Sequence, residues 1–109
     1  TTGGAWHGDG LGGRAAGPVA HLDQLGGAAR VPRGAVIVTP AVTPAMALVI
    51  EGAAAIVCEH GSLLDHGPAM ARELGVPCVV GCAGVVDTAV DGEWLEVDGD
   101  AGTVRRVGP

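Results

Sequence analysis

The sequence predicts an α/β domain with a small central sheet, two main helices and a C-terminal β-hairpin. Several short apolar runs have the length of buried strands. Between them, capping and turn residues mark where helices begin and end. Near the C-terminus, two runs alternate between apolar and polar residues, as in a hairpin. With 109 residues, the chain is long enough for one hydrophobic core and too short for two. We therefore expect one domain over residues 14–109, preceded by a flexible glycine-rich lead-in over residues 1–13.

The first half of this domain is expected to hold two strands and a helix. The first strand covers residues 14–22, and Pro18 predicts a place near a sheet edge or a strand start because proline donates no ladder hydrogen bond. A β-branched run, Ala35–Thr39, fits a buried strand. Residues 43–52 begin with Thr-Pro and end with Gly, which is typical of a helix N-cap, first turn and C-terminal stop.

The second half is expected to hold a strand, a helix, a strand and the hairpin. Ala53–Glu59 and Val76–Cys82 have the apolar content of buried strands, and a helix from about Pro68 to Leu74 lies between them. A strand–helix–strand unit of this length predicts a parallel pair. Residues 92–107 contain two alternating runs around an Asp/Gly-rich turn, which predicts a closing hairpin.

Composition and charge exclude several function classes. Six basic against twelve acidic residues give a net charge of −6, which argues against a surface that binds nucleic acid. Trp6 and Trp94 are the only aromatic residues, so base stacking is nearly excluded. No apolar run approaches the roughly 18 residues of a membrane span, and the start lacks the charged-then-apolar order of a signal peptide. We expect a cytoplasmic domain with no membrane contact.

The cysteines are expected to be buried, reduced thiols. Cys58, Cys78 and Cys82 are odd in number and lie in or beside apolar runs, which does not suit a disulfide framework. Together with His60 they supply metal-ligating residue types, but their spacing does not match a common zinc pattern. We therefore expect no metal site.

His66 is the candidate functional residue. It lies just before the predicted second helix, and a helix N-terminus favours an anion such as a phosphoryl group. Gly61 and Gly67 leave the histidine uncrowded, so an imidazole nitrogen could carry a phosphoryl group as a covalent intermediate. Arg72, six residues further on, has a conditional phosphate-binding role. Taken alone, His66 is more simply explained as a structural or solvent-facing residue.

A family resemblance favours the functional interpretation of His66 over the structural one. The run GSLLDHGPAMARELGVPCVVG, which ends at Gly81, resembles the signature of the phosphohistidine swivelling domain of phosphoenolpyruvate-utilising enzymes. That family includes phosphoenolpyruvate synthases, pyruvate phosphate dikinases and rifampicin phosphotransferases. The preceding strand, Thr-Pro turn and helix, and the closing hairpin, are also similar to the family pattern, so the resemblance covers about residues 13–107.

The resemblance implies a swivelling β/β/α domain that acts as a mobile phosphoryl carrier. In that role His66 accepts a phosphoryl group from an ATP- or phosphoenolpyruvate-binding partner and passes it to a second site, in a dikinase or phosphotransferase reaction. The domain alone is expected to bind no cofactor. ATP and Mg²⁺ are implied on an ATP-grasp partner, and a further partner would bind phosphoenolpyruvate, pyruvate or another acceptor, on the same chain or on separate subunits. Thr39 and Thr43 match the family's threonine turn, and Arg72 matches its Ala-Arg pair.

Asp65 departs from the family pattern, which usually has Ser or Thr before the histidine. A carboxylate next to His66 would orient the ring but would repel a dianionic phosphoryl group. We expect Asp65 to cap the helix instead, since Asp is a preferred N-cap residue. Otherwise the transfer chemistry is altered, or the domain is a non-catalytic interaction or structural module that has lost phosphotransfer. A further alternative is a swivelling domain of a hydro-lyase, which closes over a substrate without a histidine.

Overall fold

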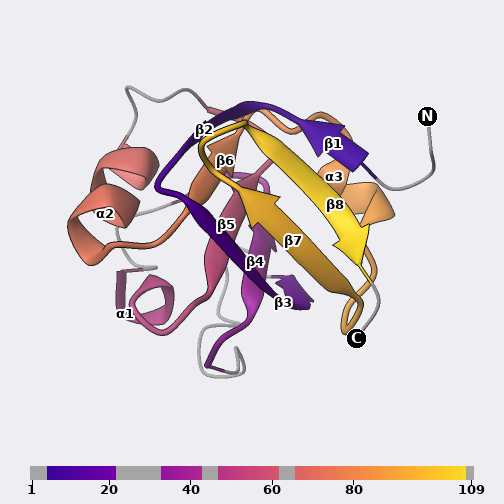
Figure 1. Cartoon of the computed structure of the whole chain (residues 1–109), viewed down its shortest axis with the longest axis horizontal. Helices are drawn as coiled ribbons and strands as arrows, with labels where there is room; N and C mark the ends of the chain where they lie inside the picture. The colour runs from indigo at the N-terminus through magenta and orange to yellow at the C-terminus, as the bar shows by residue number, and fades with distance from the viewer. Residues whose placement is uncertain (1–4, 22–32, 43–46, 62–65, 108–109) are drawn as a thin grey trace.

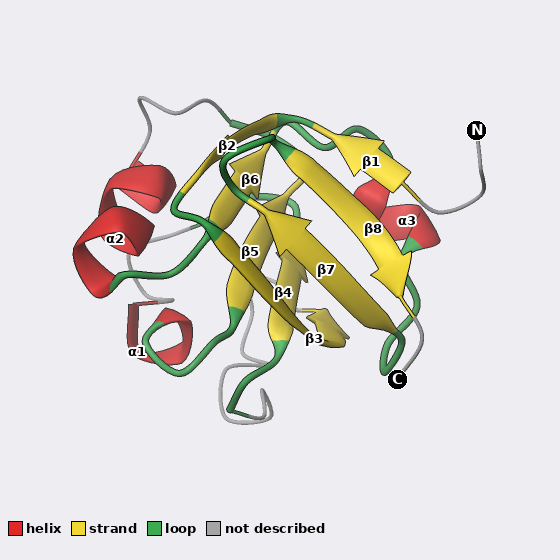
Figure 2. Ribbon diagram, in the orientation of Figure 1, coloured by secondary structure: helices red, strands yellow, loops and turns green. Residues whose placement is uncertain are grey.

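The computed structural model describes residues 5–21, 33–42, 47–61 and 66–107. Within these residues, eight strands form one sheet in the order β1-β8-β7-β3-β4-β5-β6-β2, and three short helices accompany them (Figures 1 and 2). The predicted α/β class is confirmed. The elements are β1 (Ala5–His7), β2 (Asp9–Leu11), β3 (Arg14–His21), β4 (Val36–Thr39), α1 (Ala47–Ile50), β5 (Ala55–Cys58), α2 (His66–Leu74), β6 (Cys78–Val80), α3 (Val85–Thr88), β7 (Trp94–Asp98) and β8 (Thr103–Val107).

The parallel half of the sheet consists of β3, β4, β5 and β6, paired in that order. Strands β4, β5 and β6 are buried along their whole length, as their β-branched sequences predict. Alternate side chains point to opposite faces, so one set packs against α1 and α2 and forms a core of its own. This core contains Ile37, Ile50, Ile56, Ala71 and Cys78.

The antiparallel half is the predicted hairpin, β7 and β8, which pairs with β3 through β7. Its inward side chains, Leu95, Val97 and Val104, pack against the second face of the parallel strands, including Val38 and Val57. The molecule therefore has three layers, with the hairpin on one face of the parallel strands and α1 and α2 on the other. This is the β/β/α arrangement that the family resemblance implies.

Strand β3 belongs to both halves. Its first part, Arg14–Pro18, pairs antiparallel with β7, and its last part, Val19–His21, pairs parallel with β4. The expectation that Pro18 lies near a sheet edge or a strand start is wrong. Pro18 is the last residue of β3 paired with β7, and the pairing with β4 begins at the next residue, Val19, so the proline stands where the strand changes partner.

The N-terminal segment is the main difference from the sequence prediction. Residues 5–11, expected as part of a flexible lead-in, form β1 and β2, so that expectation is wrong for them. β1 pairs with β8 and β2 pairs with β6, and Gly8 alone separates the two strands. The segment thus joins the two ends of the strand order. Trp6 is buried in the core and its indole Nε1 donates to Thr88 Oγ1 at 3.0 Å.

Glycines permit this closure because backbones cross there at short range. A Cβ atom on Gly8 would lie 2.1 Å from the Val80 carbonyl oxygen, and one on Gly99 would lie 2.0 Å from the Leu11 carbonyl oxygen. The Gly8 N–H donates to the Gly102 carbonyl at 2.9 Å, which fastens the segment to the hairpin turn. These glycines serve close packing and not chain flexibility.

Both described ends of the chain lie on one side of the molecule. Ala5, which begins β1, is paired with Arg105 near the end of β8. Helix α2 lies on the opposite side, beyond the parallel strands (Figure 1). In the part of the chain that the structure describes, no helix has the length and apolar character needed to cross a membrane.

Candidate functional site

Helix α2 begins at His66. The structure thus places this residue at the first helical position, two residues ahead of the predicted start near Pro68. The first N–H groups of a helix lack intrahelical acceptors, and the helix dipole makes this end positive. The nine-residue helix ends as predicted at Gly75, which has φ +72°. There the Val76 N–H donates to the Ala71 carbonyl at 2.9 Å, in the arrangement of a Schellman motif.

Thr39 lies at the carboxyl end of β4 and is fully buried. Its hydroxyl donates to the Ala41 carbonyl at 3.0 Å, and its own carbonyl accepts the Glu59 N–H at 3.1 Å. Thr39 therefore lies next to the end of β5, from which the chain continues towards His66. Its hydroxyl organises the turn after β4. Thr43 and Asp65, the other residues predicted around the site, lie outside the described residues.

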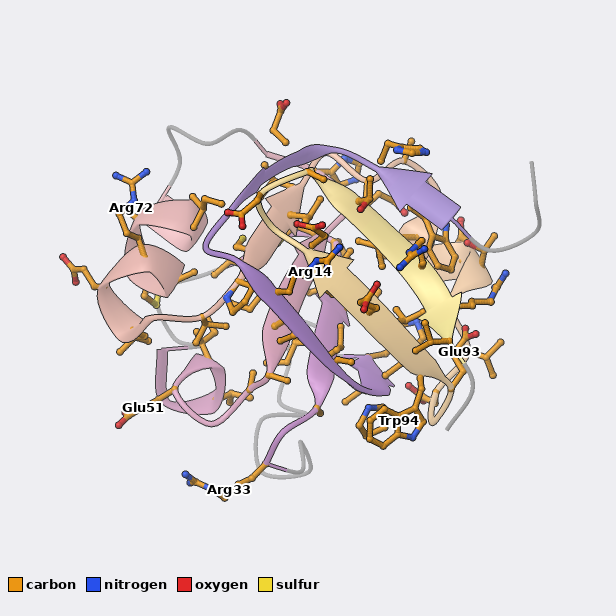
Figure 3. The ribbon with its side chains drawn as sticks, viewed as in Figure 1. Arg14, Arg33, Glu51, Arg72, Glu93 and Trp94 are labelled. Atoms are coloured by element: carbon orange, nitrogen blue, oxygen red, sulfur yellow. The ribbon has the colours of Figure 1, made fainter. Side chains whose placement is uncertain are left out.

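Arg72 is exposed in the last turn of α2 and points away from the sheet (Figure 3). Six residues separate it from His66, which is about 240° around a helix of 3.6 residues per turn. The two residues therefore do not share a helix face. A cation in the last turn also interacts favourably with the negative end of the helix dipole.

Two ionisable side chains that the sequence analysis did not assign to the site hold α3 at this edge of the sheet. The Val86 N–H donates to Glu59 Oε1 at 3.1 Å, and His21 Nε2 lies 3.2 Å from the Val86 carbonyl oxygen. Glu59 directly follows β5, and a polar residue right after a buried strand is a signal that could have indicated it. His21 is bound to Asp91, 70 residues away, and no local pattern indicates such a pair.

His21 has oxygen acceptors at both ring nitrogens. Nδ1 lies 2.6 Å from Asp91 Oδ1, and Nε2 faces the Val86 carbonyl. A neutral imidazole has only one N–H, so only the imidazolium donates to both oxygens at once. The hydrogen bond from the His21 side chain lowers the pKa of Asp91, and a second bond from the His21 backbone N–H acts in the same direction.

The cysteines are buried thiols, as predicted. Burial raises the pKa of Cys82 to about 12, and a hydrogen bond with Cys78 together with burial raises the pKa of Cys58. The thiolate is the reactive form of cysteine, so Cys58 and Cys82 are inert at neutral pH. Among the described residues, no three His, Cys, Asp or Glu side chains gather as metal ligands.

The chain is similar to known proteins over most of its length. Residues 31–102 match the family profile of the mobile domain of PEP-utilising enzymes. Phosphoenolpyruvate synthase of Escherichia coli is 37% identical over 92 residues, which are 82% of this chain and 12% of that protein. The chain thus spans about a tenth of the length of the curated relatives it matches.

Solved structures with a similar fold include those of Enzyme I and of an aconitase X. A solution structure of Enzyme I has a TM-score of 0.60 and 28% identity, covering 68% of this chain and 31% of that one. Aconitase X of Thermococcus kodakaraensis has a TM-score of 0.70 and 20% identity, covering 96% of this chain and 99% of that one. At that identity the second likeness concerns the fold alone.

Proposed function

Because the chain belongs to the family of mobile domains of PEP-utilising enzymes, we propose that it is a phosphoryl carrier whose His66 accepts and then donates a phosphoryl group. The position of His66 at the start of α2 carries this proposal. Unpaired N–H groups and the positive end of the helix dipole favour the added negative charge there.

The proposed chemistry divides one transfer into two. An imidazole nitrogen of His66 attacks the phosphorus atom of the donor, the new P–N bond forms while the donor's P–O bond breaks, and the displaced oxygen keeps the electron pair. In the second half-reaction the acceptor oxygen attacks phosphorus and the imidazole leaves. Separating the two steps allows each to proceed away from water.

The donor and acceptor sites are proposed to lie on other domains or subunits. An ATP-grasp partner would hold ATP and Mg²⁺, and another partner would hold phosphoenolpyruvate, pyruvate or a different acceptor. The small share of its relatives that this chain spans supports such a division of labour. The whole reaction would be of the dikinase or phosphotransferase type, with this domain dependent on its partners.

The neighbouring residues have supporting roles in this proposal. Asp65 would cap α2 with its carboxylate and so keep that charge away from the phosphoryl group. Thr39 would hold the turn after β4 through its bond to Ala41, and Thr43 belongs to the same predicted threonine turn. Arg72 would stabilise the C-terminal end of α2, since it does not share a helix face with His66.

A labelling experiment tests the role of His66. The chain is incubated with labelled phosphoenolpyruvate or β-labelled ATP and a phosphoenolpyruvate synthase that lacks its own mobile domain. We expect acid-labile, base-stable label in the wild type and none in His66→Ala, while His60→Ala keeps its label. Label that persists in His66→Ala would remove this histidine from the mechanism.

Asp65 favours a second candidate, an interaction module that keeps the fold without phosphotransfer. A carboxylate about 4 Å from a phosphoryl group would repel it by several kcal/mol before screening, at an effective dielectric constant near 20. In that case the wild type takes up no label with any donor. Asp65→Ser, which restores the family residue, would then be the variant that gains label.

A further inference from the structure

Val86 in α3 is held from two sides by side chains that come from different strands. Glu59, which follows β5, accepts its N–H at 3.1 Å, and His21, the last residue of β3, faces its carbonyl at 3.2 Å. Both strand ends belong to the carboxyl edge of the parallel strands. This is the edge from which the chain leads on to His66.

Glu59 supplies an N-terminal cap for α3, which the residue before the helix does not provide. The residue before this helix is Gly84, which has no side chain to cap the unpaired N–H groups of the first turn. The Glu59 carboxylate accepts one of these N–H groups at the positive end of the helix, where a negative charge is favoured. Its side chain is 21% exposed, so the bond is partly shielded from water.

The backbone around Glu59 is tied to its neighbours as well. The Glu59 N–H donates to the Thr39 carbonyl at 3.1 Å, and the His60 N–H donates to the Pro40 carbonyl at 3.0 Å. On the other side, the Cys82 N–H donates to the Cys58 carbonyl at 3.0 Å. The backbone bonds fix the end of β5 to the end of β4 and to the segment after β6, and the carboxylate adds the connection to α3.

We propose that Glu59 is a positioning residue for phosphoryl transfer. By fastening the carboxyl end of β5 to α3, it sets the point from which the chain runs to His66, and so the orientation of the accepting imidazole. Its second oxygen, Oε2, lies 3.7 Å from Nε2 of the exposed His60 ring. This inference rests on the proposed function of His66.

The test compares Glu59→Ala and Glu59→Gln in the whole chain, with potassium phosphoramidate as a small phosphoryl donor. The histidine nitrogen displaces ammonia from phosphorus, and ³¹P NMR distinguishes the two phosphohistidine isomers. For Glu59→Ala we expect the rate at His66 to fall about tenfold and the isomer ratio to move towards a mixture, because small misplacements of reacting groups are costly. Exchange of the Val86 amide hydrogen should become faster in parallel.

Glu59→Gln is the conservative control, because a carboxamide oxygen still accepts the Val86 N–H. It should keep the rate, the isomer ratio and the Val86 exchange close to those of the wild type. Glu51→Ala removes an exposed carboxylate beyond α1 and should change none of them (Figure 3). If Glu59→Ala does not fold, Glu59→Asp, shorter by one methylene group, is expected to show the same losses.

The outcomes separate the two proposals. If the wild type takes up phosphoryl groups at other histidines and not at His66, the proposed function fails. If His66 is labelled and Glu59→Ala shows faster Val86 exchange with an unchanged rate and isomer ratio, Glu59 only caps α3 and the positioning role is overturned.

Discussion

Asp98 illustrates how much of the hairpin depends on a single residue. Its Oδ1 accepts the N–H groups of Asp100 and Ala101, each at 3.0 Å, and its Oδ2 accepts Arg14 Nε at 3.1 Å. One carboxylate therefore closes the β7–β8 turn and ties it to β3. The bond from the Ala101 N–H, followed by that from Arg14, lowers the pKa of Asp98.

The lowered pKa makes the contribution of Asp98 dependent on pH. Its stabilisation is complete above the ordinary aspartate pKa of about 4 and is lost as the pH falls through the lowered value. Asp98→Asn keeps an oxygen acceptor and loses the charge, so its free energy of unfolding should approach that of the wild type at low pH. Urea denaturation between about pH 2 and pH 6 measures this difference. Glu51→Gln is the control, and parallel pH curves for Asp98→Asn and the wild type would contradict the prediction.

Residues with local sequence signals could be predicted from the sequence. Residues whose role depends on a contact with a distant part of the chain could not. His66 is found because glycine, proline and a family signature mark a helix start locally. The bond between Glu59 and Val86 joins residues 27 apart, and its formation depends on where α3 folds back. The role of Glu59 thus becomes visible only when β5 and α3 are seen together.

At the scale of elements, the same division separates the inner strands of the sheet, which the sequence indicates, from the two end strands, β1 and β2, which it does not. Strands β4, β5 and β6 are apolar runs bounded by turns, and β7 and β8 alternate, so their sequences indicate them. β1 and β2 are three residues each, lie in a glycine-rich segment, and carry no periodicity. Their composition looks like that of a linker because the glycines are required by backbones that cross closely.

A substitution at Gly8 tests this explanation. Gly8→Ala places a Cβ against the Val80 carbonyl oxygen, and relieving the overlap should cost about 1–3 kcal/mol of unfolding free energy. At Gly52, where a Cβ would come no closer than 3.7 Å to the Arg33 side chain, the same change should stay within about 0.5 kcal/mol. Urea denaturation compares the two variants, and equal effects would mean that close packing does not explain Gly8.

For the molecule as a whole, the N-terminal segment is predicted to be part of the folding unit. Deleting residues 1–13 removes β1 and β2, their pairing with β8 and β6, and the buried Trp6 side chain. The loss of a buried tryptophan alone costs about 3–5 kcal/mol, so the unfolding free energy should fall by at least that much. Circular dichroism and urea denaturation measure the effect. A truncated chain as stable as the intact one would restore the view of this segment as a lead-in.

The pairing of β1 with β8 places both described ends of the chain on the side of the domain opposite α2. Ala5 and Arg105 lie together at one side, and α2 with His66 lies at the other, in a molecule whose longest extent is 34 Å. If the domain pivots near the Ala5–Arg105 pair, α2 and its first residue, His66, move through a wider arc than the strands next to that pair. Because β3 pairs with strands of both halves of the sheet, we expect the two halves to rotate together as one unit and α2 to follow them.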